Sequence, residues 1–337
     1  MKPYLEKLSS NVDLTFEEAI DAMQMIMSGE STSAQFGSFV TALRMKGETV
    51  DEIAGMASVM RKMSLSVNND ADLLDTCGTG GDGLGTFNIS TAAAFVSAGI
   101  GIKIAKHGNR AMSSNTGSAD VLESLGININ LTPGQVTECI KISNFGFMFA
   151  QGFHPAMKYA GPPRREIGIR TVFNILGPLT NPAGAKKQLI GVSDPQVGDL
   201  MAQSLKRLGS EAALIVHGND GLDEITVSDS SQMWILKNGD ISTETFSPES
   251  LGVNIQPLSE LKVNNSEESA QMIESVLEGT HGPTRDIVLL NSAAAIFISG
   301  HADNFQDAFV KSQYSIDNGL AIKTLNLVRE FSHTLND

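Results

Sequence analysis

The stretch Asp75–Arg110 constrains the fold of this chain more than any other part of the sequence. A short apolar run ends in a segment with five glycines between positions 78 and 85, and a predicted helix follows over Ala92–Ala98. A second predicted strand, Gly101–Ala105, then leads into a loop with the sequence Lys-His-Gly-Asn-Arg. Strand, glycine loop, helix and strand in this order predict a βαβ unit, in which both strands run parallel.

The two loops of this unit predict a site for a phosphate-rich small molecule. Glycine backbone can enter positive φ and present consecutive N–H groups to an anion. Asn88, Ser90 and Thr91 stand where the helix begins, and a helix N-terminus binds phosphate well. Because parallel strands end at the same edge of a sheet, Lys106 is expected to face the glycines across one crevice. The glycines match neither the P-loop nor the dinucleotide fingerprint, and a simple tight turn is the alternative interpretation.

Composition narrows the possible functions. The 337 residues are 41% hydrophobic, enough for a large core and a smaller second domain. A net charge of −14 argues against a nucleic-acid partner, which would require a basic face. Cys77 and Cys139 suggest neither a disulfide framework nor a metal motif, and Cys77 is predicted to be a buried strand cysteine. No signal peptide or membrane span is predicted, so we expect a soluble, cytoplasmic protein.

Two kinds of sequence pattern along the chain indicate two kinds of domain. Residues 1–66 predict helices, with capping-box patterns that begin at Thr15 and Thr49. The polar segment 66–71 marks a boundary, after which strands and helices alternate and predict a largely parallel sheet. Helical character returns over Ala156–Leu176, where a proline pair is expected to interrupt the helix.

Five motifs carry a resemblance to a known family. The sequence is similar to the anthranilate phosphoribosyltransferases over nearly its whole length, with no large insertion. The motifs are GTGGD at Gly78–Asp82, NIST at Asn88–Thr91, KHGNR at Lys106–Arg110, RREIGIRTVFNILGPLTNPA at Arg164–Ala183 and HGNDGLDE at His217–Glu224.

The resemblance implies a nucleoside phosphorylase-like fold, with a small helical domain and a large α/β domain whose central sheet is mostly parallel. The small domain would be discontinuous, made of residues 1–66 with 156–183. The large domain would comprise 67–155 with 184–337. The resemblance also implies an active site in the cleft between the domains, Mg²⁺ as cofactor, and a homodimer formed through the helical domain.

The implied reaction transfers a phosphoribosyl group from 5-phosphoribosyl 1-pyrophosphate (PRPP) to the amine of anthranilate. Its products are N-(5-phosphoribosyl)anthranilate and pyrophosphate, and its transition state is oxocarbenium-like. The residues implied for PRPP are Gly78, Thr79, Gly80, Gly81, Asp82, Thr86, Asn88, Ser90, Thr91 and Lys106. Those implied for anthranilate are Gly78, His107, Asn109 and Arg164, and those for the metal are Ser90, Asp223 and Glu224.

Several individual roles remain open at this level. Asp82 is expected to serve ribose hydroxyls, a metal or a lysine, or else only to form a turn. Arg110 is a reserve candidate for the phosphates. His107 is expected to position the acceptor, with a packed core histidine as the alternative. Gly177–Pro178 is expected to shape the acceptor channel, and Met157 stands where some relatives carry a larger aromatic residue near the acceptor.

Two other functions compete with the transferase. A pyrimidine nucleoside phosphorylase shares the fold, but it would not need the adjacent carboxylates of Asp223 and Glu224. A non-enzymatic, nucleic-acid-binding relative would be expected to lack GTGGD or the acidic pair and to carry a basic surface. Both motifs are intact and the chain is strongly acidic, so the sequence favours the transferase.

Overall fold

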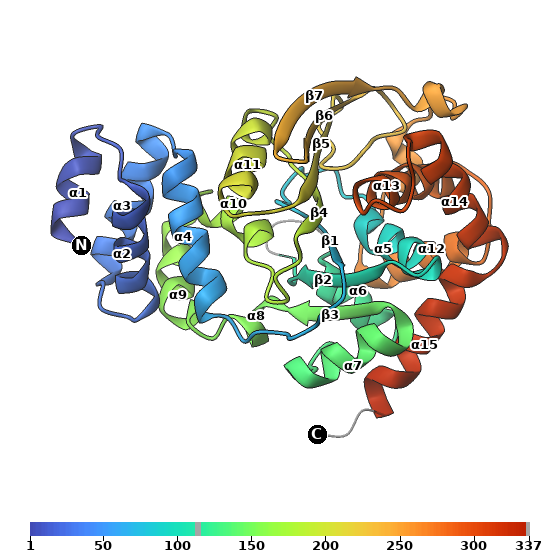
Figure 1. Ribbon diagram of the computed structural model, residues 1–337, viewed down its shortest axis with the longest axis horizontal. Coiled ribbons are helices and arrows are strands. Elements are labelled where there is room, and N and C mark those ends of the chain that lie inside the picture. Colours follow the sequence, from blue (N-terminus) through green and yellow to red (C-terminus); the bar gives the residue numbers. More distant parts are fainter. Residues whose placement is uncertain (112–115, 335–337) are drawn as a thin grey trace.

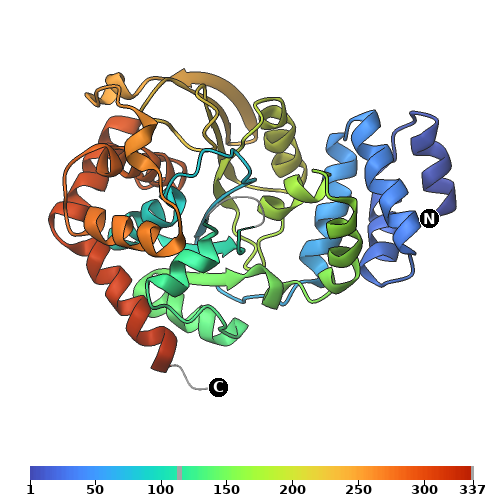
Figure 2. The same cartoon turned by 180° about the vertical axis from the view of Figure 1, so that it is seen from behind.

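The computed structural model describes residues 1–111 and 116–334 and contains a helical bundle at one end of a larger α/β body (Figures 1 and 2). The bundle comprises α1 (Lys2–Ser9), α2 (Phe16–Met27), α3 (Ser33–Lys46) and α4 (Val50–Met63). Capping boxes begin α2 at Thr15 and α4 at Thr49, which confirms both sequence predictions. Each satisfies backbone N–H groups that would otherwise lack partners at a helix start.

A seven-stranded sheet forms the centre of the body, in the order β3-β2-β1-β4-β5-β6-β7. The first five strands of this order are parallel, and β6 and β7 extend the sheet as an antiparallel meander. The predicted, mostly parallel sheet is therefore confirmed. The strands are β1 (Leu73–Gly78), β2 (Lys103–Gly108), β3 (Phe145–Phe149), β4 (Lys187–Gly191), β5 (Ala212–Gly218), β6 (Ser231–Lys237) and β7 (Asp240–Phe246).

Alternating residues of the strands enter two different cores. Leu189 of β4 belongs to the core on one face of the sheet, whereas its neighbour Ile190 belongs to the other. The first core contains α5 (Ile89–Gly99) and α13 (Pro283–Ile298). The second core is continuous with the helical bundle, because α11 (Gln196–Arg207) packs against both the sheet and α4. The bundle is therefore fixed to one face of the sheet by shared apolar packing.

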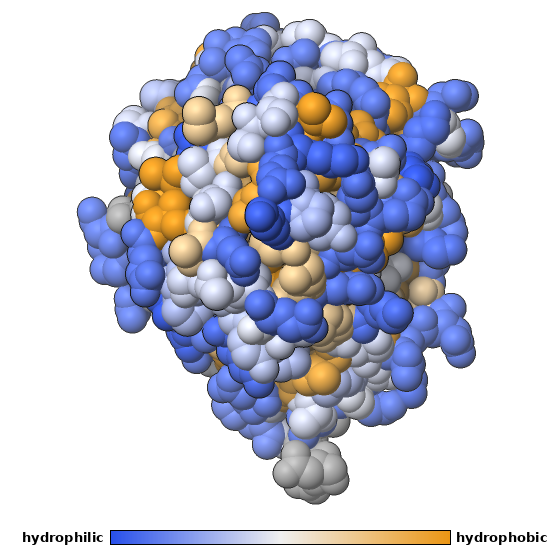
Figure 3. Space-filling view, turned by 90° about the vertical axis from the view of Figure 1, so that its left-hand side faces the viewer, coloured by the Kyte–Doolittle hydropathy of each residue, from blue (hydrophilic) through white to orange (hydrophobic). Residues whose placement is uncertain are grey.

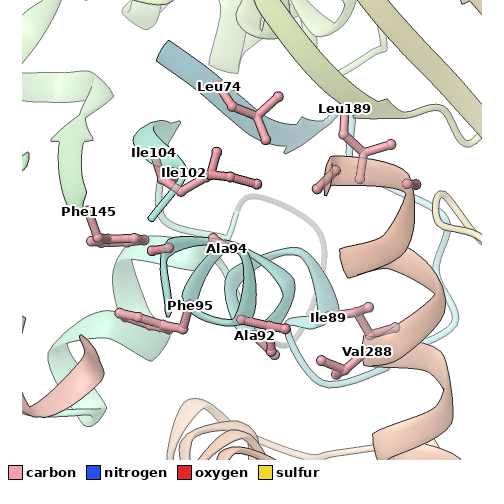
Figure 4. Close-up of a cluster of buried hydrophobic side chains, with 14 of the residues drawn as sticks. Leu74, Ile89, Ala92, Ala94, Phe95, Ile102, Ile104, Phe145, Leu189 and Val288 are labelled. Carbon is pink, nitrogen blue, oxygen red and sulfur yellow. The ribbon is translucent and has the colours of Figure 1, made fainter. Parts of the chain in front are cut away.

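Helix α5 is buried on nearly every side, and this fixes its N-terminus beside the glycine loop. Figure 4 shows Ala92 and Phe95 of α5 among side chains from the sheet and from α13. The rings of Phe95 and Phe145 stack with centroids 4.5 Å apart, and burial of one such side chain contributes about 1.5–3 kcal/mol. Asn88 caps the helix, since its side chain accepts a hydrogen bond of 3.1 Å from the Thr91 N–H.

The remaining helices complete the body. No described helix is long and apolar enough to cross a membrane. These helices are α6 (Ser118–Ser124), α7 (Pro133–Ser143), α12 (Ser266–Leu277), α14 (Phe305–Asp317) and α15 (Leu320–Thr334), with 3₁₀ turns η2 (Pro248–Leu251) and η3 (Leu258–Leu261).

Between β3 and β4 the chain leaves the sheet and returns to the helical bundle. This insert contains α8 (Ala150–Phe153), α9 (Met157–Ile167), α10 (Phe173–Leu176) and the turn η1 (Gly177–Leu179). Helix α9 packs against α2 and α3. Where the insert departs and returns, its backbone is hydrogen-bonded to the segment after α4: Leu65 N–H donates to Phe153 O (2.9 Å), and Val67 N–H donates to Pro182 O (3.1 Å). The three passages between bundle and body therefore run side by side.

Two predicted boundaries were wrong. The proline pair Pro162–Pro163 does not interrupt α9, which runs to Ile167 and ends before Gly168, a residue in the left-handed region at φ 66°. The prolines remove hydrogen bonds to the carbonyls of Lys158 and Tyr159, and both of these residues are exposed, so water can replace the lost donors. Strand β2 begins later than predicted and runs to Gly108, so Lys106 lies within the strand and not after it.

Strand β7 was not predicted, because its polar sequence is typical of an exposed edge.

Candidate active site

A cavity of about 560 Å³ lies between the carboxyl ends of β1 and β2 and the insert. Its wall combines the glycine loop, the start of α5, the end of β2 and residues of α9, α10 and η1. The predicted site residues in this wall are Gly78, Thr79, Gly80, Gly81, Asp82, Thr86, Asn88, Ser90, Lys106, His107, Asn109, Arg164, Asp223 and Glu224. The two loops predicted to face one crevice do so.

The glycine loop lies close against the acidic loop that follows β5. A Cβ atom on Gly78 would lie 3.1 Å from Asp223 Oδ2, and one on Gly191 would lie 1.6 Å from the Asp223 carbonyl oxygen. Gly80 N–H donates to Asp223 Oδ2 at 3.1 Å. Glycine at these positions therefore permits a close approach that any side chain would prevent.

Three carboxyl groups gather at this end of the cavity, which we call the donor end: Asp82, Asp223 and Glu224. Burial raises the pKa of Asp223 to about 7, with a further contribution from the neighbouring charge of Asp82. Burial and the Asp223 charge raise the pKa of Glu224 well above its usual range, which Lys106 partly opposes. These carboxyl groups therefore favour a nearby cation.

Lys106 is a cation close enough to lower the pKa of Glu224. Its side chain is only 1% exposed. Its Nζ donates to the Thr76 carbonyl oxygen, to Thr76 Oγ1 (3.3 Å) and to Ser90 Oγ (3.1 Å). Burial lowers its pKa, an effect that the charge of Asp75 opposes. The ammonium group is thus held beside the N-terminus of α5, at the cavity wall, with the strand fixing its direction.

The part of the wall that α9, α10 and η1 contribute, which we call the acceptor end, contains Arg164. Its guanidinium lies 5.9 Å from the ring centroid of Phe173, and it forms no ion pair with a described residue. Partial burial lowers its pKa. Arg165, the next residue, is exposed and lies outside the cavity wall, so of these two arginines only Arg164, the one implied for anthranilate, lines the cavity. An unpaired guanidinium on an apolar ring suits an aromatic carboxylate.

His107 faces the same cavity as a neutral imidazole. Its side chain is 8% exposed, and its Nε2 has no hydrogen-bond partner among the described residues. Burial lowers its pKa to about 3, with a smaller contribution from His154, whose ring centroid is 5.0 Å away. Burial likewise lowers the pKa of His154 to about 4. At neutral pH neither ring competes with Arg164 for an anion.

The other residues that the sequence singled out have settings that argue against a direct role. Thr91 is buried in the first turn of α5 and is absent from the cavity wall. Arg110 lines the wall, but it pairs with Asp120 and Glu123, so its charge is already balanced. Met157 packs against the helical-bundle core and not in the wall. Cys77 lies in a strand, as predicted, but it lines the cavity and is half-buried and not fully buried. Desolvation raises the pKa of its thiol well above the usual range, which disfavours the reactive thiolate.

A buried network that sequence reasoning missed ties the insert to the strands of the site. The Asp75 carboxylate accepts hydrogen bonds from His107 N–H (3.1 Å) and from Asn181 Nδ2 (2.8 Å). Asn181 Nδ2 also donates to Ala105 O at 2.8 Å. Asp75 is fully buried, and burial raises its pKa. The network therefore positions the backbone of His107 relative to the end of the insert.

Arg170 was also missed, although the motif that contains it was quoted. It follows α9, and its guanidinium binds the carbonyl oxygens of Gly80 and Gly81 in the glycine loop, each at 3.3 Å. It also donates to Ser193 Oγ at 3.2 Å. The contact spans about ninety positions of sequence, so no local pattern predicts it; three arginines within seven residues were the only signal.

The donor end fits Mg²⁺ by its chemistry. Half-buried carboxylates at Asp223 and Glu224, with the Ser90 hydroxyl nearby, supply the oxygen ligands that this ion prefers. Within residues 1–111 and 116–334, no group of three or more His, Cys, Asp and Glu side chains is arranged to hold a metal on its own. Mg²⁺ typically binds through one or two carboxylates together with water and substrate phosphates, which is consistent with this incomplete set.

Comparison with known proteins identifies the class. Residues 70–322 match the glycosyl transferase family, a/b domain, and residues 2–64 match the glycosyl transferase family, helical bundle domain. The chain is therefore a glycosyl transferase with both of these domains.

Individual relatives narrow this class. The chain is 49% identical to the anthranilate phosphoribosyltransferase of Methylobacillus flagellatus over 97% of both proteins, and 50% identical to that of Moorella thermoacetica over 96% of both. The crystal structure of the Thermus thermophilus enzyme matches with a TM-score of 0.93 at 38% identity, covering 98% of this chain and 99% of that one. The Saccharomyces cerevisiae enzyme in complex with PRPP and Mg matches with a TM-score of 0.91 at 30% identity, covering 99% and 98%. The chain belongs to the anthranilate phosphoribosyltransferase family.

Proposed function

We propose that this cavity transfers the phosphoribosyl group of PRPP to the amine of anthranilate, a step of tryptophan biosynthesis. One observation carries the assignment of the two ends. A glycine loop and a carboxylate pair occupy the donor end, whereas an arginine with no anionic partner among the described residues occupies the acceptor end. A diphosphate with a bound cation would match the groups of the donor end, and an aromatic carboxylate would match those of the acceptor end.

At the donor end, the loop Gly78–Asp82 and the N-terminus of α5 would bind the pyrophosphate through backbone N–H groups. Asn88, Ser90 and Thr86 line the same wall. Lys106 would place positive charge beside the departing group. Thr91 lies behind this wall, so we propose an indirect role for it, through the cap that its N–H forms with Asn88.

Ser90, Asp223 and Glu224 would hold Mg²⁺. Bound there, the ion would offset the negative charge that develops on the pyrophosphate as it leaves. Asp82 lies beside Asp223 and also accepts a hydrogen bond of 3.2 Å from Leu84 N–H. Asp82 therefore forms the turn that the sequence allowed, and we propose that it also adds negative charge to the metal site.

At the acceptor end, Arg164 would bind the anthranilate carboxylate, and Phe173, Asn109 and Gly177–Pro178 would surround the ring. The amine would then attack the anomeric carbon from the side opposite the pyrophosphate. The amine loses its proton readily once it is alkylated, so positioning matters more than a strong base. Neutral His107 suits a positioning role, because its unpartnered Nε2 can accept or donate one hydrogen bond.

We further propose that residues 1–66 with 156–183 act as one helical domain and that two copies associate through it. Packing of α9 on α2 and α3 supports the first statement. For the second, Figure 3 shows apolar side chains exposed at the helical end, and Met45 of α3 is 83% exposed. Sedimentation at micromolar concentration would give the mass of two chains. Two free cysteines agree with the reducing cytoplasm that we propose as its compartment.

Anthranilate fluorescence tests the proposed function. The protein is mixed with anthranilate, PRPP and Mg²⁺, and the decay of fluorescence is followed with and without a chelator. We expect decay that depends on PRPP and stops when Mg²⁺ is removed. A folded protein that consumes no anthranilate under these conditions would overturn the proposal. Uridine with inorganic phosphate then tests the phosphorylase alternative, for which we expect no turnover.

A further inference from the structure

The Gly80 residue is held from two sides by groups far apart in the sequence. Its N–H donates to Asp223 Oδ2 at 3.1 Å. Its carbonyl oxygen accepts from both Nη atoms of Arg170 at 3.3 Å and from Ser193 Oγ at 3.1 Å. Ser193 N–H also donates to Thr79 Oγ1 at 3.3 Å. Side chains from three other segments of the chain therefore hold the glycine loop in place.

The Arg170 guanidinium donates hydrogen bonds to two successive carbonyl oxygens, those of Gly80 and Gly81. In a trans peptide, the C=O of one residue and the N–H of the next point to opposite sides. The N–H groups of Gly81 and Asp82 are therefore directed away from the guanidinium. Neither of these N–H groups has an acceptor among the described residues. Two adjacent, unpaired N–H groups on one side of a loop form a binding surface for an anion.

The close fit of Arg170 depends on glycine. Gly81 has φ +79°, and a Cβ atom there would lie 2.3 Å from Arg170 Nη1. Gly80 has φ +63°, but a Cβ atom there would meet nothing within 4 Å. The two positions share the left-handed backbone, whereas only Gly81 must also admit the guanidinium.

Arg170 belongs to the insert that contributes the acceptor end. It follows the helix that contains Arg164, and its own carbonyl oxygen accepts a hydrogen bond from Arg44 of α3. A planar guanidinium can bind several acceptors at once, which a lysine ammonium cannot do with the same geometry. The insert therefore contacts the donor loop through one side chain.

We propose that Arg170 is a positioning residue for PRPP: it orients the glycine loop so that the N–H groups of Gly81 and Asp82 face the pyrophosphate. This inference rests on the proposed function, since it assumes that the loop binds the donor. It adds a residue to the donor site that comes from the acceptor side of the cavity. The matched comparison residue is Arg165, which lies in the same segment, is exposed and is absent from the cavity wall.

Steady-state kinetics of Arg170→Gln, Arg170→Lys and Arg165→Gln test the proposal, together with calorimetry of pyrophosphate binding in the presence of Mg²⁺. For both Arg170 variants we expect KM for PRPP and Kd for pyrophosphate to rise roughly tenfold, the loss expected for a charge-assisted hydrogen bond. KM for anthranilate should change little. Arg165→Gln should match the wild type, and all variants should unfold at similar temperatures because Arg170 is exposed.

Three outcomes would overturn the proposal. Full recovery of PRPP affinity in Arg170→Lys would show that only positive charge is needed, as in a direct contact with phosphate. An unchanged KM for PRPP in Arg170→Gln, with an active wild type, would remove Arg170 from the donor site. An equal rise of both KM values would indicate a general structural defect. An inactive wild-type protein would instead overturn the proposed function, so the two failures are distinguishable.

Discussion

The donor and acceptor ends of the cavity differ in the sign of the charge that is not balanced by other side chains. At the donor end, Asp82, Asp223 and Glu224 crowd together, and Lys106 offsets only part of their charge. At the acceptor end, Arg164 has charge without a described anionic partner, and His107, which lines the same cavity, is neutral. If these charged side chains served only to stabilise the fold, we would expect the arginine and the carboxylates to form ion pairs with each other. The lack of an ion pair between Arg164 and these carboxyl groups among the described residues indicates that each end is completed by a substrate.

Removal of the acidic pair should have the largest effect. For Asp223→Asn/Glu224→Gln we expect kcat/KM to fall at least about hundredfold, the scale for loss of a preorganised electrostatic group. Without Mg²⁺, the variant should unfold at a higher temperature than the wild type, because it lacks the repulsion between these carboxyl groups. Kinetics and thermal denaturation check both statements. Asp229→Asn, an exposed aspartate nearby, should change neither. Undiminished activity would remove the pair from the donor site.

Arg164→Gln should affect the other end. We expect KM for anthranilate to rise about tenfold or more, because a charge-assisted contact with the carboxylate is lost. KM for PRPP should stay within a factor of about two, which corresponds to well under 1 kcal/mol of binding free energy. Initial rates with each substrate varied in turn give both constants. A rise in KM for PRPP alone would contradict the division of the cavity into two ends.

The glycine loop offers a smaller, paired test. Alanine at Gly80 or Gly81 would occupy a left-handed conformation, with a cost of about 1–2 kcal/mol at either position. Only Gly81→Ala would also displace the Arg170 guanidinium. We therefore expect KM for PRPP to rise more in Gly81→Ala than in Gly80→Ala, and the difference to disappear in an Arg170→Gln background. If the difference in KM between the two alanine variants is the same in the Arg170→Gln background as without that substitution, Arg170 does not act through Gly81.

The neutral histidines predict a pH effect on stability, the smallest effect considered. His107 and His154 have pKa values lowered from 6.5 to about 3 and about 4. Between those values and 6.5, the unfolded chain binds more protons than the folded one, so the free energy of unfolding should fall as pH drops through this window. Urea denaturation from pH 7.5 to 5 should show a shallower fall for His154→Gln. The exposed His281→Gln should retain the wild-type slope.

Local patterns in the sequence predicted the parts of the fold that local physics determines. The capping boxes at Thr15 and Thr49 begin helices where expected. The βαβ unit was predicted because its glycines, its apolar helix and its second strand lie within one short stretch. The alternation of strands and helices likewise predicted the mostly parallel sheet.

The contacts that sequence reasoning missed join distant segments. Arg170 reaches Gly80 across the insert, and Asn181 reaches Asp75 through the core. Neither contact has a spacing that a reader of the sequence could recognise. The extent of β2 was also misjudged, because the polar residues Lys106 and His107 indicated a loop. The strand tolerates them because the Lys106 ammonium finds hydroxyl and carbonyl acceptors.

The most direct test of the two-ended cavity removes the anion from the acceptor itself. Aniline retains the amine and the ring of anthranilate but lacks the carboxylate. We predict that wild-type protein and Arg165→Gln prefer anthranilate to aniline strongly in kcat/KM, and that Arg164→Gln loses most of this preference while its KM for PRPP is unchanged. A preference that survives intact in Arg164→Gln would contradict the assignment of the acceptor end.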